Sequence, residues 1–246
     1  MTNYDNVVLL KNKNYSEQRK YWLQQLSDLT FDQILDTEHN NRLAVDRKDT
    51  IHFTIESSIV EKLLNMSNHM ELALYTILLA NFKCSLFKYT GKSDLWVITP
   101  FLKENCEEDL FDDGLIIRTI LSEELSIKEV INHVKDSIIA AVNNKDYAFR
   151  SIINELEYKG NYFQNRNNSI AFFSEKLHGK EPCVSKKSNA AVSYVITEKN
   201  NNRFLYIQCS YLQATENGAT GKMLHHYLGH MRCEPGNEIV IFRYTL

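Results

Sequence analysis

Three side chains toward the end of the sequence have the types and spacing of a zinc site. His226 and His230 are four residues apart, so a helix places both on one face, and Cys233 follows three residues later. A structural zinc ion takes four ligands, and no fourth ligand is identifiable here. Histidines are also favoured at helix C-termini, where they meet the helix dipole. We therefore expect a helix end at this position and no metal.

The adjacent His225 and His226 are also of the type used in general acid–base catalysis. A general base needs neighbours that orient it and set its pKa, and no carboxylate lies near this pair in the sequence. The chain has no Gly-x-Ser-x-Gly turn and no glycine-rich phosphate loop. We predict no catalytic residue and no cofactor.

Arg118 is the one charged residue of a predicted strand, Leu115 to Leu121. Its guanidinium either forms a structural ion pair with Asp113, five residues earlier, or belongs to a binding site. The structural pair is favoured, because such pairs are commoner than sites. His133 lies beside the apolar face of a predicted helix and is interpreted as a surface residue.

The helix that the rest of the chain must pack around is predicted from Glu71 to Gly91. Its apolar residues recur at steps of three and four, which indicates a broad buried face formed by Leu74, Tyr75, Leu78, Leu79, Phe82, Leu86 and Tyr89. Lys83 and Lys88 are expected to place charge toward its far end, with Gly91 as the C-cap. The uncharged run is too short to cross a bilayer.

The remaining periodicity predicts an α/β (α+β) fold, with a mixed sheet of about six strands covered by about five helices. Further helices are expected at residues 16–29, with Ser16 as N-cap, and at 57–66, 126–142, 149–156 and 221–231. Strands are expected at residues 50–55, 95–99, 115–121, 169–173, 190–197, 203–211 and 238–245. The three strands between residues 169 and 211 have the order of a meander. One domain, 1–246, is expected, with 1–49 as a leading helix and linker and 50–246 as the main lobe.

Composition excludes several classes of protein. The 246 residues are 43% hydrophobic and carry a net charge of −3 without long charged runs, which argues against a nucleic-acid groove or a membrane-binding patch. The first residues do not form a signal peptide, so a cytoplasmic location is expected. The five cysteines are odd in number and never form a Cys-x-x-Cys pair, which favours packing over disulfides.

Several motifs, in a consistent order, carry a resemblance to a known family. They are Tyr21-Trp22-x-x-x-Leu26, Leu78 to Phe82 followed by Lys88 to Asp94, Thr99-Pro100, Asp113-Gly-Leu-Ile-Ile-Arg118 and Lys145-Asp146-Tyr-Ala-Phe149. Together they resemble the C-terminal lobe of condensation domains from nonribosomal peptide synthetases, which have the chloramphenicol-acetyltransferase-like fold. The resemblance covers about residues 16–232. Departures from the family pattern are Asp113 in place of asparagine, Ala148 in place of proline and Lys103 in place of arginine.

The resemblance also implies what is absent. A complete condensation domain has two lobes, and the His-His-x-x-x-Asp-Gly motif associated with amide-bond formation belongs to the first. The sequence from His225 to Met231 does not match it, because His230 stands at the aspartate position and Met231 at the glycine position. The family-like positions Asp113, Arg118 and Phe149 are the candidates for contact with a carrier protein, its phosphate arm, or the other lobe.

The expected function is therefore an accessory half-condensation protein of a nonribosomal peptide or hybrid peptide/polyketide assembly line, which binds a carrier protein or synthetase module. An alternative is a split enzyme, in which a complementary condensation lobe on another chain supplies the histidine motif. A third hypothesis is a homodimer that covers exposed lobe surface. A fourth is a lobe excised from a longer synthetase.

Overall fold

The computed structural model describes residues 3–29, 48–55, 57–99, 114–147, 155, 170–178, 192–199 and 204–212. Its strands are β1 (Lys48–Ile55), β2 (Asp94–Thr99), β3 (Leu115–Ile120), β4 (Ile170–Ser174), β5 (Val192–Lys199) and β6 (Phe204–Leu212). Its helices are α1 (Asn3–Leu26), α2 (Ser57–Met66), α3 (Glu71–Thr90), α5 (Ile127–Asn143) and the short α7 (Glu175–His178). The predicted α/β class is confirmed.

The six described strands form one mixed sheet in the order β1-β6-β5-β4-β2-β3. Strand β4 pairs in parallel with both β2 and β5, and the other neighbours are antiparallel. The predicted meander is therefore wrong at its first step. Parallel neighbours need a crossover of roughly a dozen residues or more, and residues 175–191 supply it, beginning with α7. A four-residue helix is too short to show a period, so the sequence did not reveal it.

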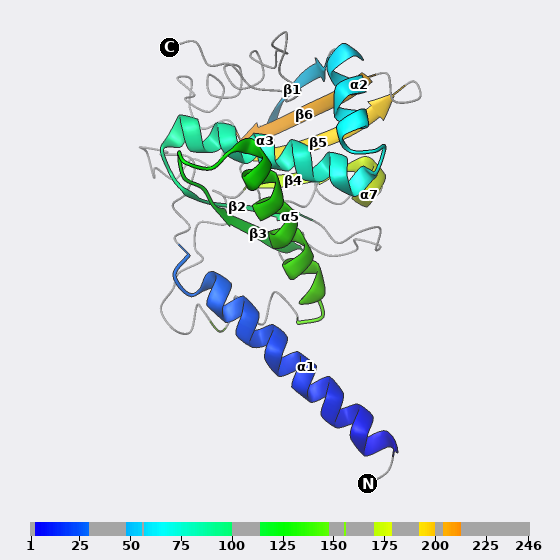
Figure 1. The fold of residues 1–246 in the computed structure, drawn as a ribbon, viewed down its shortest axis with the longest axis vertical. Coiled ribbons are helices and arrows are strands. Elements are labelled where there is room, and N and C mark those ends of the chain that lie inside the picture. The colour runs from blue at the N-terminus through cyan, green and yellow to red at the C-terminus, as the bar shows by residue number, and fades with distance from the viewer. Residues whose placement is uncertain are drawn as a thin grey trace.

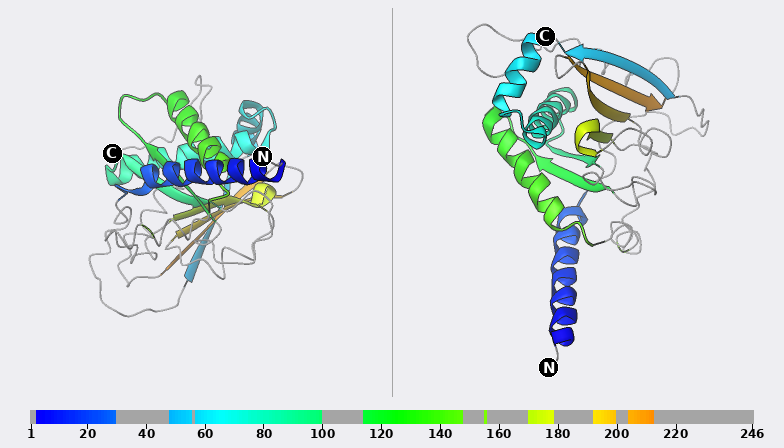
Figure 2. Two further views of the ribbon diagram at one scale, coloured as in Figure 1. Left: turned by 90° about the horizontal axis from the view of Figure 1, so that it is seen from below. Right: turned by 90° about the vertical axis from the view of Figure 1, so that its right-hand side faces the viewer.

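Helices α2, α3 and α5 lie on the same side of the sheet (Figures 1 and 2). Helix α1 touches this layer only near its C-terminal end, and its N-terminal part extends away from the lobe (Figure 1). Trp22 and Leu26 of α1 are buried in the core together with residues of α3 and the central strands. The leading helix is thus anchored to the lobe at its C-terminal end.

Helix α1 is longer than predicted, and Ser16 lies inside it instead of capping it. The amphipathic pattern marks only the stretch that packs on the lobe, through residues such as Trp22 and Leu26. A helix continues beyond such a stretch when no residue stops it.

Helix α3 has the expected buried stripe. Tyr75, Leu79, Phe82 and Leu86 are each at most 3% exposed, and the side chain of Tyr89 lies outside the described set. Gly91 ends the helix as predicted: it adopts a left-handed φ of 67°, and its N–H donates to the carbonyl of Phe87. Cys84 packs against the core, also as predicted, and burial raises the pKa of its thiol to about 11.

Lys83 was expected to place charge toward the far end of α3, and its side chain is fully buried there. It lies four residues after Leu79 and therefore on the buried stripe. Its Nζ donates to the carbonyl oxygens of Leu95 in β2 (3.1 Å) and Ile117 in β3 (2.7 Å), and to Thr119 Oγ1 (2.8 Å). Three acceptors match the three N–H groups of an ammonium, so α3 is tied to both strands at one point. Burial lowers the pKa of this amine well below its usual range, and the nearby Asp94 charge opposes that shift.

The turn between α2 and α3 bends the chain by 115°. Asn68 and His69 have positive φ values of 49° and 56°, a region that asparagine and histidine enter more readily than most residues. Among the described residues, no single helix has the length and hydropathy of a membrane span, and α2 with α3 pass that test only as this bent pair.

Helix α5 begins where the sequence predicted. Ser126 is its N-cap and forms a reciprocal capping box with Glu129, whose carboxylate accepts the Ser126 N–H at 2.8 Å. Val130, Val134, Ile138 and Ala141 form its buried face. The start and the rotation of α5 against β3 are thereby fixed.

Replacement of Lys83 by methionine tests the burial of its amine. An unfolded chain holds the lysine proton up to a pKa of about 10.4, whereas the folded protein releases it at a lower pH, so Lys83 makes wild-type stability rise with pH across this interval. We expect the unfolding free energy of K83M, relative to wild type, to fall between about pH 7 and about pH 9.5. Urea unfolding at both pH values measures this difference.

The matched control is Lys62→Met, which removes an exposed lysine on α2. Its stability difference from wild type should not change with pH. A K83M difference that is equally independent of pH would contradict the assignment.

Candidate functional site

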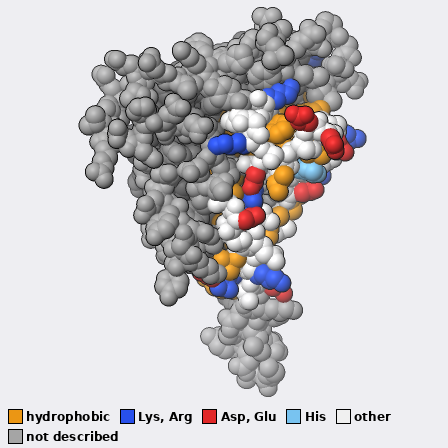
Figure 3. Space-filling model, turned by 90° about the vertical axis from the view of Figure 1, so that its left-hand side faces the viewer, with side chains coloured by type: hydrophobic (Ala, Val, Ile, Leu, Met, Phe, Trp, Pro, Cys, Tyr) orange, Lys and Arg blue, Asp and Glu red, His pale blue; other side chains and the backbone are white. Residues whose placement is uncertain are grey.

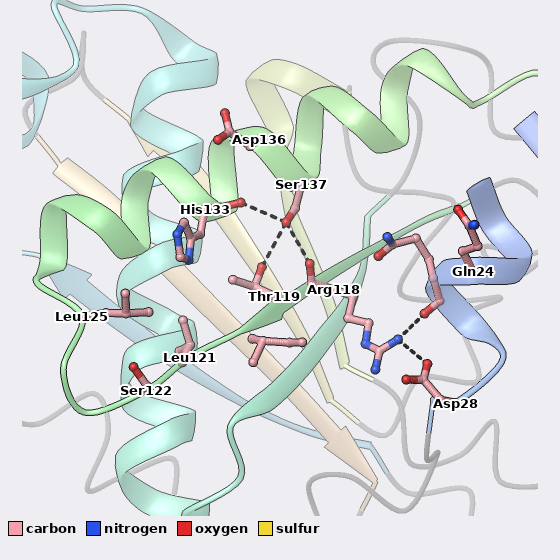
Figure 4. A pocket seen from close by; sticks show the side chains of 12 residues that line it. Gln24, Asp28, Arg118, Thr119, Leu121, Ser122, Leu125, His133, Asp136 and Ser137 are labelled. Carbon is pink, nitrogen blue, oxygen red and sulfur yellow. Dashed lines mark hydrogen bonds and ion pairs between the residues drawn. The ribbon is translucent and has the colours of Figure 1, made fainter.

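Arg118 joins three elements at the edge of the described sheet. Its Nε and Nη2 donate to the two carboxylate oxygens of Asp94 at 2.8 and 2.6 Å, which forms a bidentate pair between β3 and β2. Its Nη1 donates to Asp28 Oδ1 at 2.8 Å and to the backbone carbonyl of Gln25, at the end of α1 (Figure 4). The side chain is only 10% exposed. Arg118 therefore fastens the leading helix to the sheet.

The electrostatics follow from this geometry. Hydrogen bonding to Asp94 raises the pKa of Arg118, with a smaller contribution from Asp28. The hydrogen bond from Arg118 lowers the pKa of Asp28. Arg118 and Asp28 are thus held in their charged forms at neutral pH.

The predicted ion pair of Arg118 with Asp113 stays a prediction. Asp113 lies outside the described residues, and the described carboxylates that pair with Arg118 are Asp94 and Asp28. Neither was predicted as a partner, because the first contact requires the β2–β3 register and the second requires the docking of α1. The other candidates, Phe149, His226, His230 and Cys233, also lie outside the described residues, so their roles stay predictions.

A second set of contacts holds α1 against the segment after α5. Trp22 Nε1 donates to the carbonyl of Asn144 at 2.8 Å, and Gln18 Oε1 accepts the N–H of Tyr147 at 2.9 Å. Arg19 forms an ion pair with Glu155 on the exposed side. The position of α1 is therefore set at two separate places on the lobe.

An open groove of about 710 Å³ lies between the end of α1, the end of β3 and α5. Its lining combines polar and apolar side chains from these elements: Gln24, Gln25, Asp28, Arg118, Thr119, Ile120, Leu121, Ser122, Leu125, His133, Asp136 and Ser137. Figure 4 shows Leu121, Leu125 and His133 toward one end of the groove and Arg118 with Asp28 toward the other. His133 is exposed, as predicted.

The hydroxyl groups in this groove are occupied. Ser137 Oγ lies 2.8 Å from the carbonyl of Arg118 and 2.9 Å from that of His133, so its single proton is donated to backbone. Thr119 Oγ1 accepts from Lys83. The described contacts of Ser137 include no side-chain base, and the Lys83 amine beside Thr119 donates its N–H groups to Thr119 and to two strand carbonyls. In the described ranges, no group of three His, Cys, Asp or Glu side chains could hold a metal ion.

A buried polar cluster lies at the other end of β2, where β2 and its parallel neighbour β4 both terminate. Tyr75 Oη lies 2.8 Å from Thr99 Oγ1 and 2.9 Å from the carbonyl of Phe172. Thr99 Oγ1 is also 3.3 Å from His178 Nε2, and the N–H of Ser174 donates to His178 Nδ1 at 2.9 Å. The sequence analysis did not single out His178, which α7 brings over β2.

The tautomer of His178 decides what this cluster can do. Nδ1 lies 2.9 Å from the donor N–H of Ser174 and 3.1 Å from the Ser174 carbonyl oxygen, so the tautomer sets whether each ring nitrogen donates or accepts. Tyr75 Oη donates toward Thr99 Oγ1 and the Phe172 carbonyl, so every side chain of the cluster has a hydrogen-bond partner. Burial lowers the pKa of His178 to about 4. His178 is thus neutral at pH 7, and the cluster ties α3, α7 and the ends of β2 and β4 together.

With this geometry established, comparison with known proteins gives the family. The condensation-domain family matches residues 5–206, which is most of the chain. The chain belongs to the condensation-domain family. The predicted chloramphenicol-acetyltransferase-like fold agrees with this assignment.

Curated relatives of this condensation-family chain are peptide synthetases. It is 27% identical to cyclosporin synthetase of Tolypocladium inflatum over 58% of the chain, and 25% identical to tyrocidine synthase 2 of Brevibacillus parabrevis over 77% of the chain. The chain spans only 1% and 6% of those proteins, respectively.

Solved structures with the same fold include condensation and X-domains. The complex of the X-domain and OxyB from teicoplanin biosynthesis matches with a TM-score of 0.67 and 14% identity, covering 88% of this chain and 51% of that one. The first condensation domain of the calcium-dependent antibiotic synthetase matches with a TM-score of 0.64 and 14% identity, at the same coverages. The chain thus spans about half the length of these solved chains.

Replacement of Arg118 by methionine should loosen the end of α1. The variant leaves the Asp94 carboxylate and the Gln25 carbonyl without a charged donor, and such hydrogen bonds contribute roughly 2 kcal/mol. We expect the free energy of unfolding to fall by about that amount, with faster amide hydrogen exchange in residues 22–28. Exchange detected by mass spectrometry, combined with urea unfolding, measures both effects.

The control is Arg19→Met, which removes the exposed Arg19–Glu155 pair on the same helix. It should leave exchange in residues 22–28 close to wild type. Equal exchange rates in wild type and R118M would show that Arg118 does not hold the helix.

Replacement of His178 by glutamine should change acid stability. An unfolded histidine takes up its proton near pH 6.5, whereas folded His178 does so only near pH 4, so wild-type stability falls as the pH drops through this interval. H178Q lacks this loss and should gain up to about 3 kcal/mol relative to wild type between about pH 7 and about pH 4. Urea unfolding at the two pH values measures it, with His133→Gln as the exposed control. A relative stability that is constant with pH would disprove the assignment.

Proposed function

We propose that this chain is an accessory condensation-type unit of a nonribosomal peptide or hybrid peptide/polyketide assembly line, which is catalytically incomplete alone and acts by binding a carrier protein or synthetase module. The observation that carries the proposal is the combination of family membership with a span of about half of each solved relative. The Arg118 cluster supports it, because each guanidinium nitrogen of Arg118 is committed to contacts that hold the fold. Residues 1–246 are proposed to act as one unit, with 1–49 leading and 50–246 as the main lobe, in the cytoplasm.

A solved relative with this fold supports a role in protein binding. The X-domain from teicoplanin biosynthesis forms a complex with OxyB. By analogy, we propose that the present chain also acts by binding a partner protein. Its identity has to come from binding experiments.

The binding test uses the purified chain and any carrier proteins and synthetase modules encoded near its gene. We expect saturable binding to at least one of them in a pull-down followed by titration calorimetry. A carrier protein of fatty acid synthesis serves as the control and should not bind. Absence of binding across the whole set would remove the basis of this proposal.

A second candidate is a split condensation enzyme, which the half-length match to solved chains also favours. Co-expression with a chain that carries the His-His-x-x-x-Asp-Gly lobe should then give a stable complex that forms amide bonds. Sedimentation of the chain by itself separates both candidates from a homodimer, for which the partner surface is supplied by a second copy.

A further inference from the structure

The groove between α1, β3 and α5 contains an arginine, but its described lining is negatively charged. Arg118 is the only lysine or arginine in the described lining, and each of its three guanidinium nitrogens already donates to a carboxylate or carbonyl oxygen. Asp28 and Asp136 also line the groove, and Asp94 lies directly behind the guanidinium. Among the described residues, three carboxylates therefore accompany one guanidinium, and this part of the groove carries a negative charge.

The ratio of carboxylates to guanidinium determines whether the groove attracts a cationic or an anionic group. An incoming phosphate or carboxylate finds Arg118 already paired and is repelled by the surrounding carboxylates. A lysine or arginine is attracted to Asp28, whose side chain is 73% exposed, and to the exposed Asp136. The electrostatics thus favour a cationic occupant.

The groove also offers apolar surface. Ile120, at the end of β3, is 63% exposed, which is the largest value among the exposed large hydrophobic side chains described. Leu121 is buried and Leu125 is half-buried beside it. On the face shown in Figure 3, apolar side chains lie among charged ones, with no broad apolar area in the part that the structure describes. An occupant with one or two apolar side chains next to its charge matches this surface better than a purely apolar one.

We propose that this groove docks a segment of a partner protein in which lysine or arginine alternates with apolar residues. The basic side chains pair with Asp28 and Asp136, and the apolar side chains cover Ile120 and Leu125. The inference deepens the binding role proposed above and rests on it, since it names the surface and the chemistry of the partner. The inference also implies that this groove does not bind the phosphate arm of a carrier protein.

The test titrates the full chain against two fluorescein-labelled peptides, Gly-Leu-Lys-Leu-Lys-Leu-Gly and the same sequence with glutamate in place of lysine. Fluorescence anisotropy should show saturable binding of the lysine peptide, weakened by salt, and no binding of the glutamate peptide. Amide chemical-shift changes should be confined to the end of α1, the end of β3 and α5.

Two substitutions at exposed positions test the two parts of the surface. Asp136→Lys reverses a groove charge and Ile120→Ser removes the exposed apolar side chain, and each should weaken lysine-peptide binding by about tenfold. Glu61→Lys makes the same charge change on α2 and serves as the matched control. It should bind as wild type does. Melting temperatures confirm that all three variants fold.

Three results would overturn the inference. They are absence of lysine-peptide binding, equal weakening by D136K and E61K, or unchanged binding by both D136K and I120S. None of these experiments contains a carrier protein or module, so their failure leaves the pull-down result standing. Conversely, an empty pull-down with intact peptide binding would reject the proposed assembly-line role and retain the docking surface.

Discussion

The paired guanidinium of Arg118 is the contact on which the arrangement of the described lobe depends most. It holds β2 against β3 through Asp94 and holds α1 against both through Asp28 and Gln25. Arg118 and Asp28 also line one end of the groove, where the described carboxylates outnumber the guanidinium. An arginine in a groove suggests an anion-binding site, but all three guanidinium nitrogens of Arg118 are used in contacts within the lobe. The carboxylates beside Arg118 therefore determine which groups the groove attracts. The Arg118 side chain thus influences the position of α1, its attachment to the sheet and the charge of the groove.

Buried polar groups specify this fold in addition to its apolar core. Lys83 reaches two strands and a threonine from the middle of a helix, and His178 connects a four-residue helix to the end of β2. Each group is hydrogen-bonded, which limits the cost of its burial. A shift of α3 by one residue would separate Lys83 from its acceptors. Such groups select one register where apolar packing alone accepts several.

The local features of the fold were predictable because they arise within short stretches of sequence. The buried stripe of α3, its Gly91 cap and the Ser126 start of α5 all follow from spacing and from the conformational preferences of single residues. The sheet order was harder to predict, since the parallel pairing of β4 and β5 depends on a crossover with little periodicity of its own. The burial of Lys83 was not predicted, because lysines are rarely found in cores, although its position on the helix places it on the buried stripe.

The candidate site was less accessible to sequence reasoning than the fold. Arg118 was singled out, but its partners come from residues 24 and 90 positions away and meet it only after the sheet and α1 have assembled. His178 lies 79 positions from the threonine that it contacts. No periodic pattern encodes such distances. The family resemblance predicted the correct fold because it depends on the order of motifs along the sequence. That order can be read from the sequence, whereas contacts between distant residues cannot.

Strand β3 is the last strand of the described sheet, and the hydrogen bond from Ser137 to the Arg118 carbonyl has a consequence for self-assembly. An outermost strand normally offers a row of free backbone groups on which another chain can add a strand, and this is a common route to aggregation. Here a serine hydroxyl from α5 already occupies the acceptor in the middle of that row. Within the described part of the sheet, this carbonyl is therefore not free to accept a hydrogen bond from an added strand.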